Sequence, residues 1–320
     1  MTTRYLAVSI DVDPVPCYYR IYGLGEPPEE LRDLVMRRCV PRFAEVLARR
    51  GVAATFFIVG ADVDVHVLGG RARAARALLG DLVAAGHELG NHSHGHPYEM
   101  ARLGADDVAR EIGACDALLR EITGRPTAGF RAPGYDLSTT MLAELARRGY
   151  AYDSSIFPAP GYYAAKAAVM AALAAVGQPS GAVMTDPRAL AAPPAPYRPA
   201  MAAPWRRGQA PLVELPIAVT PWARIPAIGT SLLLAPPWAR RATVAAMRGR
   251  RFFNFELHGM DLADAEADGI PGELVARQAD LRRPLADKLA AFEAVLDQAL
   301  AHFEPVTLRD AASWVHREIC

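Results

Sequence analysis

The chain lacks the features that mark several common protein classes. It has no CxxC pair, and its four cysteines stand far apart, at Cys17, Cys39, Cys115 and Cys320. Zinc-ribbon and thioredoxin-like sites are therefore unsupported, and free thiols in a reducing compartment are the simplest interpretation. Basic and acidic residues balance at 35 each. This balance gives no indication of a nucleic-acid partner, because nucleic-acid-binding domains usually carry a basic excess.

Long apolar stretches are missing as well. No segment approaches ~18 uninterrupted apolar residues, so we expect no transmembrane segment. The opening residues, MTTRYLAVSIDVD, contain no apolar run long enough for the core of a signal peptide. We therefore expect a cytoplasmic protein, and a peripheral membrane association stays open. Hydrophobic residues nevertheless make up 52% of the 320 positions, which is ample for a sizeable core.

What the sequence does contain is a regular alternation of apolar strands and helices. Such an alternation indicates parallel βαβ units, whose strands are covered on both faces or close into a barrel. In the first half, strands are expected at 5–10, 53–60, 87–92, 127–133 and 150–155, with helices at 31–51, 72–86, 105–124 and 138–149. Pro41 is expected to kink or break the first of these helices.

The alternation is interrupted by a Pro/Ala-rich segment at about 158–241. Its composition and its weak periodicity indicate an irregular insertion with one strand at 211–219, rather than a separate globular domain. The alternation then resumes with a strand at 250–259, a long helix at 272–303, a last strand at 305–308 and a short terminal helix. Pro284 is expected to break or start the long helix. We therefore expect residues 1–320 to form a single domain.

Four of the eight histidines lie within the stretch GHELGNHSHGHP at 86–97. Glycine and asparagine favour turns, so one interpretation is a solvated loop without function. The other interpretation is a metal site, because histidine is the commonest metal ligand. His92 and His96 are four residues apart and would share one face of a helical turn, whereas His94 would point elsewhere. A hydrolytic zinc needs three protein ligands, so a third ligand must come from another part of the chain.

Two aspartates supply a candidate for that third ligand. Asp11 and Asp13 lie at the end of the first strand with one residue between them, so their side chains share one face of an extended segment. In a parallel barrel, the carboxyl ends of the strands carry the chemistry. Two carboxylates held this close repel each other unless a cation intervenes. The alternative is a pair of turn-forming aspartates that cap the next element.

Together with three later motifs, these residues resemble the polysaccharide deacetylase superfamily, the carbohydrate esterases of family 4. The five motifs occur in the family's order from Asp11 to His258, as DVD, HSHGH, FRAPGY, YDSSIFP and FELHG. The spaced DVD form is similar to a cytoplasmic branch of the superfamily that includes peptidoglycan deacetylase-like and allantoinase-like members. The resemblance implies an α/β fold, namely a distorted (β/α) barrel of about seven parallel strands.

The resemblance also implies roles for residues in the first three motifs. Asp13, His92 and His96 would hold a divalent metal ion. Zn²⁺ is the expected ion, while cobalt, nickel or iron stays open. Asp11 would be the general base, and Arg131 would pair with Asp11 and hold its pKa down. Taken alone, Arg131 could be a surface arginine, although the flanking Phe130 and Pro133 favour a specifically placed one.

The remaining motifs imply roles at the substrate. By resemblance, the backbone around Gly134 and Tyr135 would help to bind the oxyanion, and His258 would be the general acid. Asp153 is the candidate that orients or tunes His258. The residues themselves leave two alternatives open. Asp153 could cap a helix, and a lone histidine at a buried strand end is more often a core residue.

A metal-activated water, an aspartate base and a histidine acid satisfy the requirements of amide hydrolysis. We therefore expect a metal-dependent hydrolase that removes an acyl group, acetyl before others, from the nitrogen of an amino sugar or a related N-acyl compound. Because no signal peptide is expected, a small-molecule, nucleotide-linked or lipid-linked substrate fits better than mature cell-wall polysaccharide. A deformylase, an allantoinase-like amidohydrolase and an esterase acting on O-acyl groups stay open.

A non-catalytic sugar- or metabolite-binding protein on the same scaffold is the alternative from another class. The joint presence of Asp11, Asp13, His92, His96 and His258 argues against it, since a decayed site would usually have lost one of them. Fold alone would not distinguish the two. Association into a homo-oligomer stays open, with the long C-terminal helix as the candidate contact.

Overall fold

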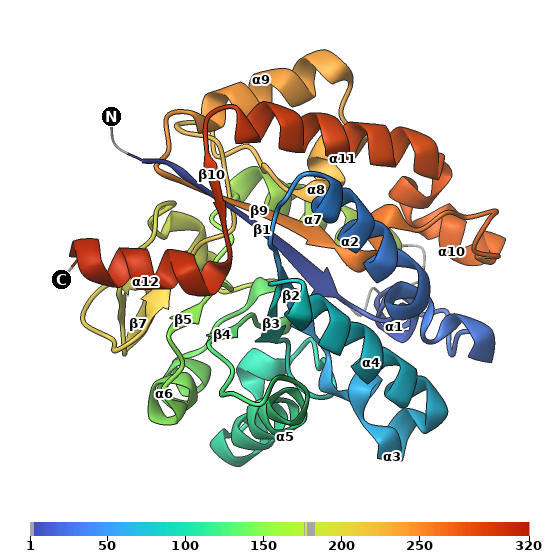
Figure 1. The fold of residues 1–320 in the computed structure, drawn as a ribbon, viewed down its shortest axis with the longest axis horizontal. Helices are drawn as coiled ribbons and strands as arrows, with labels where there is room; N and C mark the ends of the chain where they lie inside the picture. The colour runs from blue at the N-terminus through green and yellow to red at the C-terminus, as the bar shows by residue number, and fades with distance from the viewer. Residues whose placement is uncertain (1–2, 176, 178–182, 320) are drawn as a thin grey trace.

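The computed structural model describes residues 3–175, 177 and 183–319 of the chain. Its central element is a curled, eight-stranded sheet in which every pairing is parallel (Figure 1). The strands are β1 (Tyr5–Val12), β2 (Thr55–Ile58), β3 (Glu88–Asn91), β4 (Gly129–Phe130), β5 (Tyr152–Asp153), β8 (Val213–Glu214), β9 (Phe252–His258) and β10 (Glu304–Val306). The predicted distorted (β/α) barrel of about seven parallel strands is confirmed.

The curl of the sheet brings its two ends close together. The strand order is β10-β1-β2-β3-β4-β5-β8. Both β10 and β2 pair with one edge of β1, at its start and at its end, and β9 pairs with the other edge. At the far end, the amide of Ala218 donates to Asn254 O at 3.2 Å, and the side chain of Asn254 donates to Leu215 O at 3.1 Å. Hydrogen bonds outside the strand ladders therefore connect β9 with the chain that follows β8.

The helices lie around the outside of this sheet (Figure 1). They are α1 (Val15–Tyr22), α2 (Val40–Arg49), α3 (Val65–Leu68), α4 (Gly70–Ala84), α5 (Ala105–Thr123), α6 (Thr139–Arg148), α7 (Pro160–Ala175), α8 (Gly229–Leu234), α9 (Pro237–Met247), α10 (Gly272–Arg277), α11 (Leu285–Leu300) and α12 (Leu308–Ile319). Short 3-10 segments include η5 (Pro133–Tyr135), η7 (Gly259–Leu262) and η8 (Ala279–Arg282), and β6 (Pro199–Ala200) with β7 (Ala203–Arg207) forms a separate antiparallel hairpin. Over the ranges that the structure describes, no helix combines the length and apolar character needed to cross a membrane.

The period-two pattern of β1 gives the barrel an apolar outside and a polar inside. Val8 and Ile10 are fully buried in the core cluster that includes residues of the surrounding helices. Ser9 and Asp11 point the other way, and Ser9 Oγ donates to Asn254 Oδ1 at 2.9 Å across the interior. The alternation therefore places the polar side chains at the centre and at the C-terminal end of the barrel, where parallel barrels carry their sites.

Two of the predicted helices are interrupted. The helix expected at 31–51 contains a π-helical segment at Val35–Cys39 that is followed by α2, because Pro41 has no N–H with which to continue the regular pattern. The helix expected at 272–303 is divided into α10, η8 and α11. Pro284 stands at the N-cap of α11, so the predicted break occurs there.

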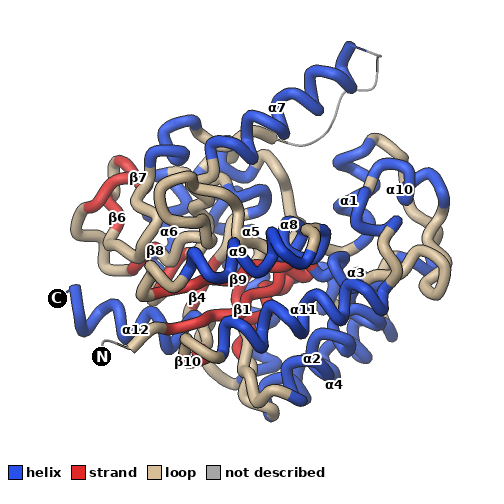
Figure 2. Tube along the Cα trace, turned by 90° about the horizontal axis from the view of Figure 1, so that it is seen from above, coloured by secondary structure: helices blue, strands red, loops and turns tan. Residues whose placement is uncertain are grey.

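The expectation of an irregular segment at 158–241 is wrong for three stretches, which form α7, α8 and α9. The sequence of α7, PGYYAAKAAVMAALAA, is apolar on nearly every side and so has no periodicity to detect. The segment also supplies β8, which pairs with β5. Leu212 and Ile217 of this segment are fully buried. Leu212 lies in the same hydrophobic cluster as Phe130, and Ile217 lies in the same hydrophobic cluster as Phe157. Figure 2 shows that α7 projects away from the body of the barrel.

Gly129, the first residue of β4, has no room for a side chain. An added Cβ would overlap the ring of Tyr152, which cannot easily move because its hydroxyl donates to Glu88 at 3.0 Å. We expect Gly129→Ala to lower the free energy of unfolding by about 1–3 kcal/mol through overpacking. Urea denaturation followed by circular dichroism measures this change.

Gly80→Ala in α4 is the matched control. An added Cβ at Gly80 meets nothing within 4 Å, so this change should raise the free energy of unfolding by about 0.5–1 kcal/mol. Equal effects of the two substitutions would show that the position at the start of β4 is not sterically constrained.

Candidate active site

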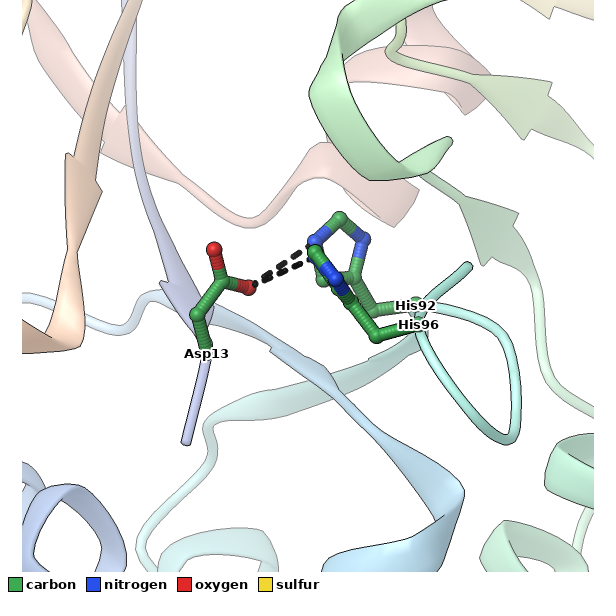
Figure 3. A group of neighbouring side chains, drawn as sticks. All are labelled: Asp13, His92 and His96. Carbon is green, nitrogen blue, oxygen red and sulfur yellow. Dashed lines mark ion pairs between the residues drawn. The ribbon is translucent and has the colours of Figure 1, made fainter. Parts of the chain in front are cut away.

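Three side chains that are distant in sequence meet at the C-terminal end of the barrel (Figure 3). Asp13 follows β1, and His92 and His96 lie in the loop that follows β3. Asp13 Oδ1 is 3.1 Å from His92 Nε2 and 3.3 Å from His96 Nε2. All three residues are buried. The structure therefore brings together the three predicted metal ligands.

The histidine loop is not helical, so a helical turn does not explain the spacing of His92 and His96. Ser93 and His96 adopt left-handed backbone conformations, with φ of 63° and 52°. The loop is held by its neighbours, since the amide of Gly95 donates to Glu111 at 2.7 Å and the amide of His96 donates to Ser93 Oγ at 3.1 Å. Two tight reversals, rather than one helical face, aim both rings at the carboxylate.

The donor atoms have the pairing expected of metal ligands. His92 Nδ1 donates to Arg131 O at 2.7 Å, which leaves the Nε2 lone pair facing Asp13. Among the residues that the structure describes, Asp13 Oδ1 and both ring nitrogens of His96 make no hydrogen bond. Buried polar atoms are rarely left unpaired, and a cation held between these atoms would satisfy them. One carboxylate and two imidazoles, with room for further ligands, suit Zn²⁺ and similar divalent ions.

The charges around Asp13 favour the form that binds a metal. Burial alone would raise the pKa of the Asp13 carboxyl group, but the neighbouring His96 and His92 outweigh burial and hold the pKa well below its ordinary value. An ionised carboxylate is the form that binds a metal ion. His94 does not join the cluster, because its Nε2 lies 3.3 Å from Asp64 Oδ2.

Arg131 lies inside the barrel and is completely buried. Its Nη1 donates to Asp11 Oδ1 at 2.6 Å, and its Nη2 donates to Ser9 Oγ and to Ser154 Oγ, each at 2.9 Å. The guanidinium group also lies 4.3 Å from the centre of the Phe57 ring. Asp11 is therefore held by the predicted arginine, and the alternative of a surface position for Arg131 is wrong.

His258 lies beside Asp11 because the two residues are register partners in the pairing of β1 with β9. Its Nδ1 is 3.1 Å from Glu256 Oε1, and its Nε2 is 3.1 Å from the hydroxyl of Tyr135. Burial lowers the pKa of His258, but Glu256 and other nearby carboxylates outweigh burial and raise it to about 9. Burial is also the main reason why the pKa of Glu256 rises to about 7. The imidazole is therefore protonated at neutral pH and can donate a proton.

Asp11, Glu256 and His258 form a second group of potential metal ligands. Here the positive charge is already present, since Arg131 pairs with Asp11 and the ring of His258 is protonated at neutral pH. A further cation would be repelled by both. This group therefore suits proton transfer better than metal binding.

Asp153 does not contact His258, so the structure does not place it where it could orient that histidine. It ends β5, which is not adjacent to β9, and its carboxylate accepts from Ser155 Oγ at 2.8 Å and from the Ser155 amide at 3.1 Å. The carboxylate beside His258 belongs to Glu256, which sequence reasoning missed. A signal was present, because Asn254, Glu256 and His258 alternate along one face of a strand.

Gly134 and Tyr135 lie at the edge of the site with left-handed backbone conformations, at φ of 68° and 62°. The amide of Tyr135 donates to Ala132 O at 3.1 Å, so this amide is already occupied. The predicted oxyanion contact would thus fall to the Gly134 backbone. The Tyr135 side chain has another part in the site, since its hydroxyl donates to Glu256 Oε1 at 3.0 Å and meets His258 Nε2.

These groups surround a cavity of about 460 Å³. Asp11, Asp13, His92 and His258 line it at the strand ends, and further walls come from α1, α7, α8 and η8. A volume of this size suits a compact ligand. The site therefore combines three candidate metal ligands, a buried aspartate, a protonated imidazole and a cavity large enough for a small molecule.

Comparison with known families and curated proteins finds similarity to deacetylases. Residues 32–152 match the family described as polysaccharide deacetylase. The chain is 26% identical over 155 residues to the peptidoglycan deacetylase of Helicobacter pylori, which covers 47% of this chain and 49% of that protein. It is also 31% identical over 140 residues to the chitooligosaccharide deacetylase of Sinorhizobium fredii. This aligned region covers 42% of this chain and 60% of that protein. The chain thus spans about half the length of these curated relatives.

Comparison with solved structures extends over nearly the whole chain. A Mycobacterium smegmatis protein described as a candidate polysaccharide deacetylase superposes with a TM-score of 0.62. The match covers 99% of this chain and 92% of that chain at 17% sequence identity. At this identity the match establishes a shared fold.

A matched pair of histidine substitutions tests the metal site. We expect His96→Ala to weaken zinc binding by at least ~100-fold, because losing a ligand should cost more than the 10- to 100-fold typical of groups behind the ligands. His94→Ala removes an imidazole from the same loop that faces Asp64 instead, and it should change zinc affinity by less than about threefold. Competition with a chromophoric chelator measures both affinities. Similar losses in the two variants would contradict the assignment of ligands.

A second pair of substitutions tests the carboxylate beside His258. In the metal-free protein, we expect Glu256→Gln to lower the pKa of His258 from about 9 by at least ~1 pH unit, because an anion that favours the imidazolium form is lost. Asp153→Asn should leave this pKa within a few tenths. NMR titration of the ring protons measures both. A larger shift in Asp153→Asn would restore the sequence-based prediction for Asp153.

Proposed function

Because residues 32–152 match the polysaccharide deacetylase family and the chain is similar to proteins named as deacetylases, we propose that it is a metal-dependent hydrolase that removes an acyl group from the nitrogen of an amino sugar or a related N-acyl compound. Acetyl is the expected acyl group, since the curated relatives are named as deacetylases. The observation that carries the proposal is the convergence of Asp13, His92 and His96 beside Asp11 and His258.

Asp13, His92 and His96 would hold the ion, and Zn²⁺ is the ion we expect. When bound, the ion supplies Lewis-acid polarisation of the acyl carbonyl and acidifies a water molecule. Asp11 accepts the proton that the attacking water loses. Arg131 occupies Asp11 Oδ1, so Asp11 Oδ2 is the oxygen that takes the proton. A positioned general base of this kind contributes about 10²- to 10⁴-fold in rate.

His258 supplies the proton that the leaving nitrogen needs, because an amine does not leave readily as its anion. In the protonated ring, Nδ1–H donates to Glu256 and Nε2–H points to the hydroxyl of Tyr135. Glu256 therefore both favours the protonated ring and fixes its orientation. Burial raises the pKa of Tyr135 well above its ordinary value, so the hydroxyl stays neutral beside the acid. The backbone at Gly134 is the proposed oxyanion contact.

We also propose that residues 158–241 are part of one catalytic domain with the remainder of the chain. Their strand β8 extends the central sheet through its pairing with β5. Val169 in α7 and Leu234 in α8 line the same cavity as Asp13 and His258. A segment that supplies both sheet and cavity wall is expected to shape substrate choice rather than to fold separately.

A substrate panel tests the proposed function. The zinc-loaded protein is incubated with N-acetyl and N-formyl amino sugars, O-acetyl sugars and allantoin, and the released amine, acetate, formate or ring-opened product is measured. We expect acetate and free amine from the N-acetyl sugars. Asp11→Asn should lower kcat by about 10²- to 10⁴-fold, as expected for the loss of a general base. Asp64→Asn is the control, because asparagine keeps the helix-capping bond of this aspartate to the His66 amide.

The outcomes separate the candidate functions. Formate alone, or ring opening alone, would replace deacetylation with deformylation or with an allantoinase-like reaction. Undiminished turnover in Asp11→Asn would remove the base assignment. A ligand-dependent rise in melting temperature without turnover of any compound would favour a binding protein over a hydrolase.

A further inference from the structure

The cavity at the candidate metal ligands is lined by polar groups at the strand ends and by a largely apolar surface on α1, α7 and α8, where Lys166, Thr230 and Ser231 are among the polar exceptions. Its polar end is formed by the strand-end carboxylates and imidazoles described above. Its apolar wall includes Ile21 from α1, Ala165, Val169 and Met170 from α7, and Leu234 from α8. A ligand that fills the whole cavity must therefore have both a polar and an apolar part.

The part of the apolar wall that α7 contributes is unusually exposed to solvent. Lys166 is the one charged residue in its sixteen positions, and the Lys166 ammonium group is turned to Val183 O, to which it donates at 2.7 Å. Val169 is 60% exposed although it lines the cavity. Helices that are apolar on nearly every side are normally covered. Because this helix borders the cavity of the metal ligands, a substrate that occupies the cavity is the partner best placed to cover it.

The polar end of the cavity holds groups that the proposed chemistry does not use. Tyr18 and Asp280 line the cavity and are only 5% and 3% exposed. Within the described part of the chain, the Tyr18 hydroxyl and Asp280 Oδ2 have no hydrogen-bond partner. A buried donor and a buried acceptor that face a cavity are suited to bind hydroxyl or amide groups of a polar head group.

We propose that the substrate is an amphiphile whose N-acylated polar head lies among Tyr18, Asp280 and the metal ligands, while a hydrocarbon chain runs along α7 past Val169. This inference rests on the proposed function and names its substrate class. The hydrocarbon chain is either attached to the sugar through its glycosidic oxygen or is part of the acyl group itself. A soluble polymer would leave the apolar wall without a partner.

Two series of compounds test the proposal and locate the chain. The first series is the methyl, butyl and hexyl glycosides of N-acetylglucosamine, and the second is N-acetyl-, N-butanoyl- and N-hexanoylglucosamine, all kept below their critical micelle concentrations. Calorimetry measures Kd for the zinc-loaded Asp11→Asn protein, which should consume the ligand about 10²- to 10⁴-fold more slowly, and kcat/KM is measured for the wild-type enzyme. In the series whose hydrocarbon chain lies along α7, we expect Kd to fall by about fourfold for each methylene that is buried. If that series is the glycosides, Kd should fall by at least ~50-fold from the methyl to the hexyl glycoside.

Val169→Asp tests the path of the chain. It places a charge on the cavity side of α7 and should reduce the gain from methyl to hexyl by at least ~5-fold. Val67→Asp is the matched control, because Val67 in α3 is similarly exposed, at 55%, and does not line the cavity. It should leave the chain-length gain within twofold of wild type. An equal reduction in both variants would show that α7 has no particular role.

Failure of this inference can be told apart from failure of the proposed function. Hydrolysis of the methyl glycoside with no chain-length gain in either series would overturn the amphiphile and leave the hydrolase standing. A chain-length gain in Kd without hydrolysis of any compound would support amphiphile binding and overturn the hydrolase.

Discussion

A single buried arginine organises the site through both its side chain and its backbone. The guanidinium group of Arg131 holds Asp11, while the carbonyl of the same residue accepts a hydrogen bond from His92 Nδ1. Arg131 thus positions the proposed base and also sets the tautomer of a proposed metal ligand. Removing one partner from a buried ion pair typically costs about 3–5 kcal/mol. Strands β1, β3 and β4 are therefore tied together by an interaction that the protein can lose only at a large cost in stability.

Electrostatics divide the site into two halves with different tasks. On one side, Asp13 Oδ1 and both ring nitrogens of His96 have no hydrogen-bond partner among the described residues, and His92 Nε2 faces Asp13. On the other side, His258 and Glu256 hold a proton at neutral pH, and Arg131 supplies a fixed positive charge. Hydrolysis of an amide needs a polarised carbonyl at one end of the bond and a proton at the other. The separation of these charges matches that need.

The sequence predicted the residues of the site better than the local structures that hold them. Strand alternation placed Asp11 and Asp13 on one face, and the resemblance of the ordered motifs to a known family indicated Arg131. The helical explanation for His92 and His96 was wrong, because left-handed turns at non-glycine residues leave little trace in a single sequence. Asp153 was assigned to His258 by resemblance to the family's motifs, yet β5 pairs with β4 and β8 and is not adjacent to β9. The contact of Glu256 with His258 arises within β9, whose alternation places both side chains on one face. The hydrogen bond from Asn254 to Leu215, just after β8, depends on the curl of the sheet.

The helix α7 was missed for a different reason. Periodicity detects a helix by the contrast between its faces, and an alanine-rich helix with almost no polar residues offers no contrast. The same property that hid the helix makes it unusual in the folded protein, because an apolar surface of this kind is seldom left uncovered. The helix that hydrophobic periodicity failed to predict, α7, is thus also a helix that borders the candidate site.

The parallel ladder between β1 and β9 pairs Asp11 with His258 directly. The spacing between the proposed proton acceptor and the proposed proton donor is therefore fixed by main-chain hydrogen bonds within the sheet, and not by any of the surface loops. The loops around the cavity can therefore differ in length without changing the distance between Asp11 and His258. The proposed chemistry and the choice of substrate thus depend on separate parts of this barrel.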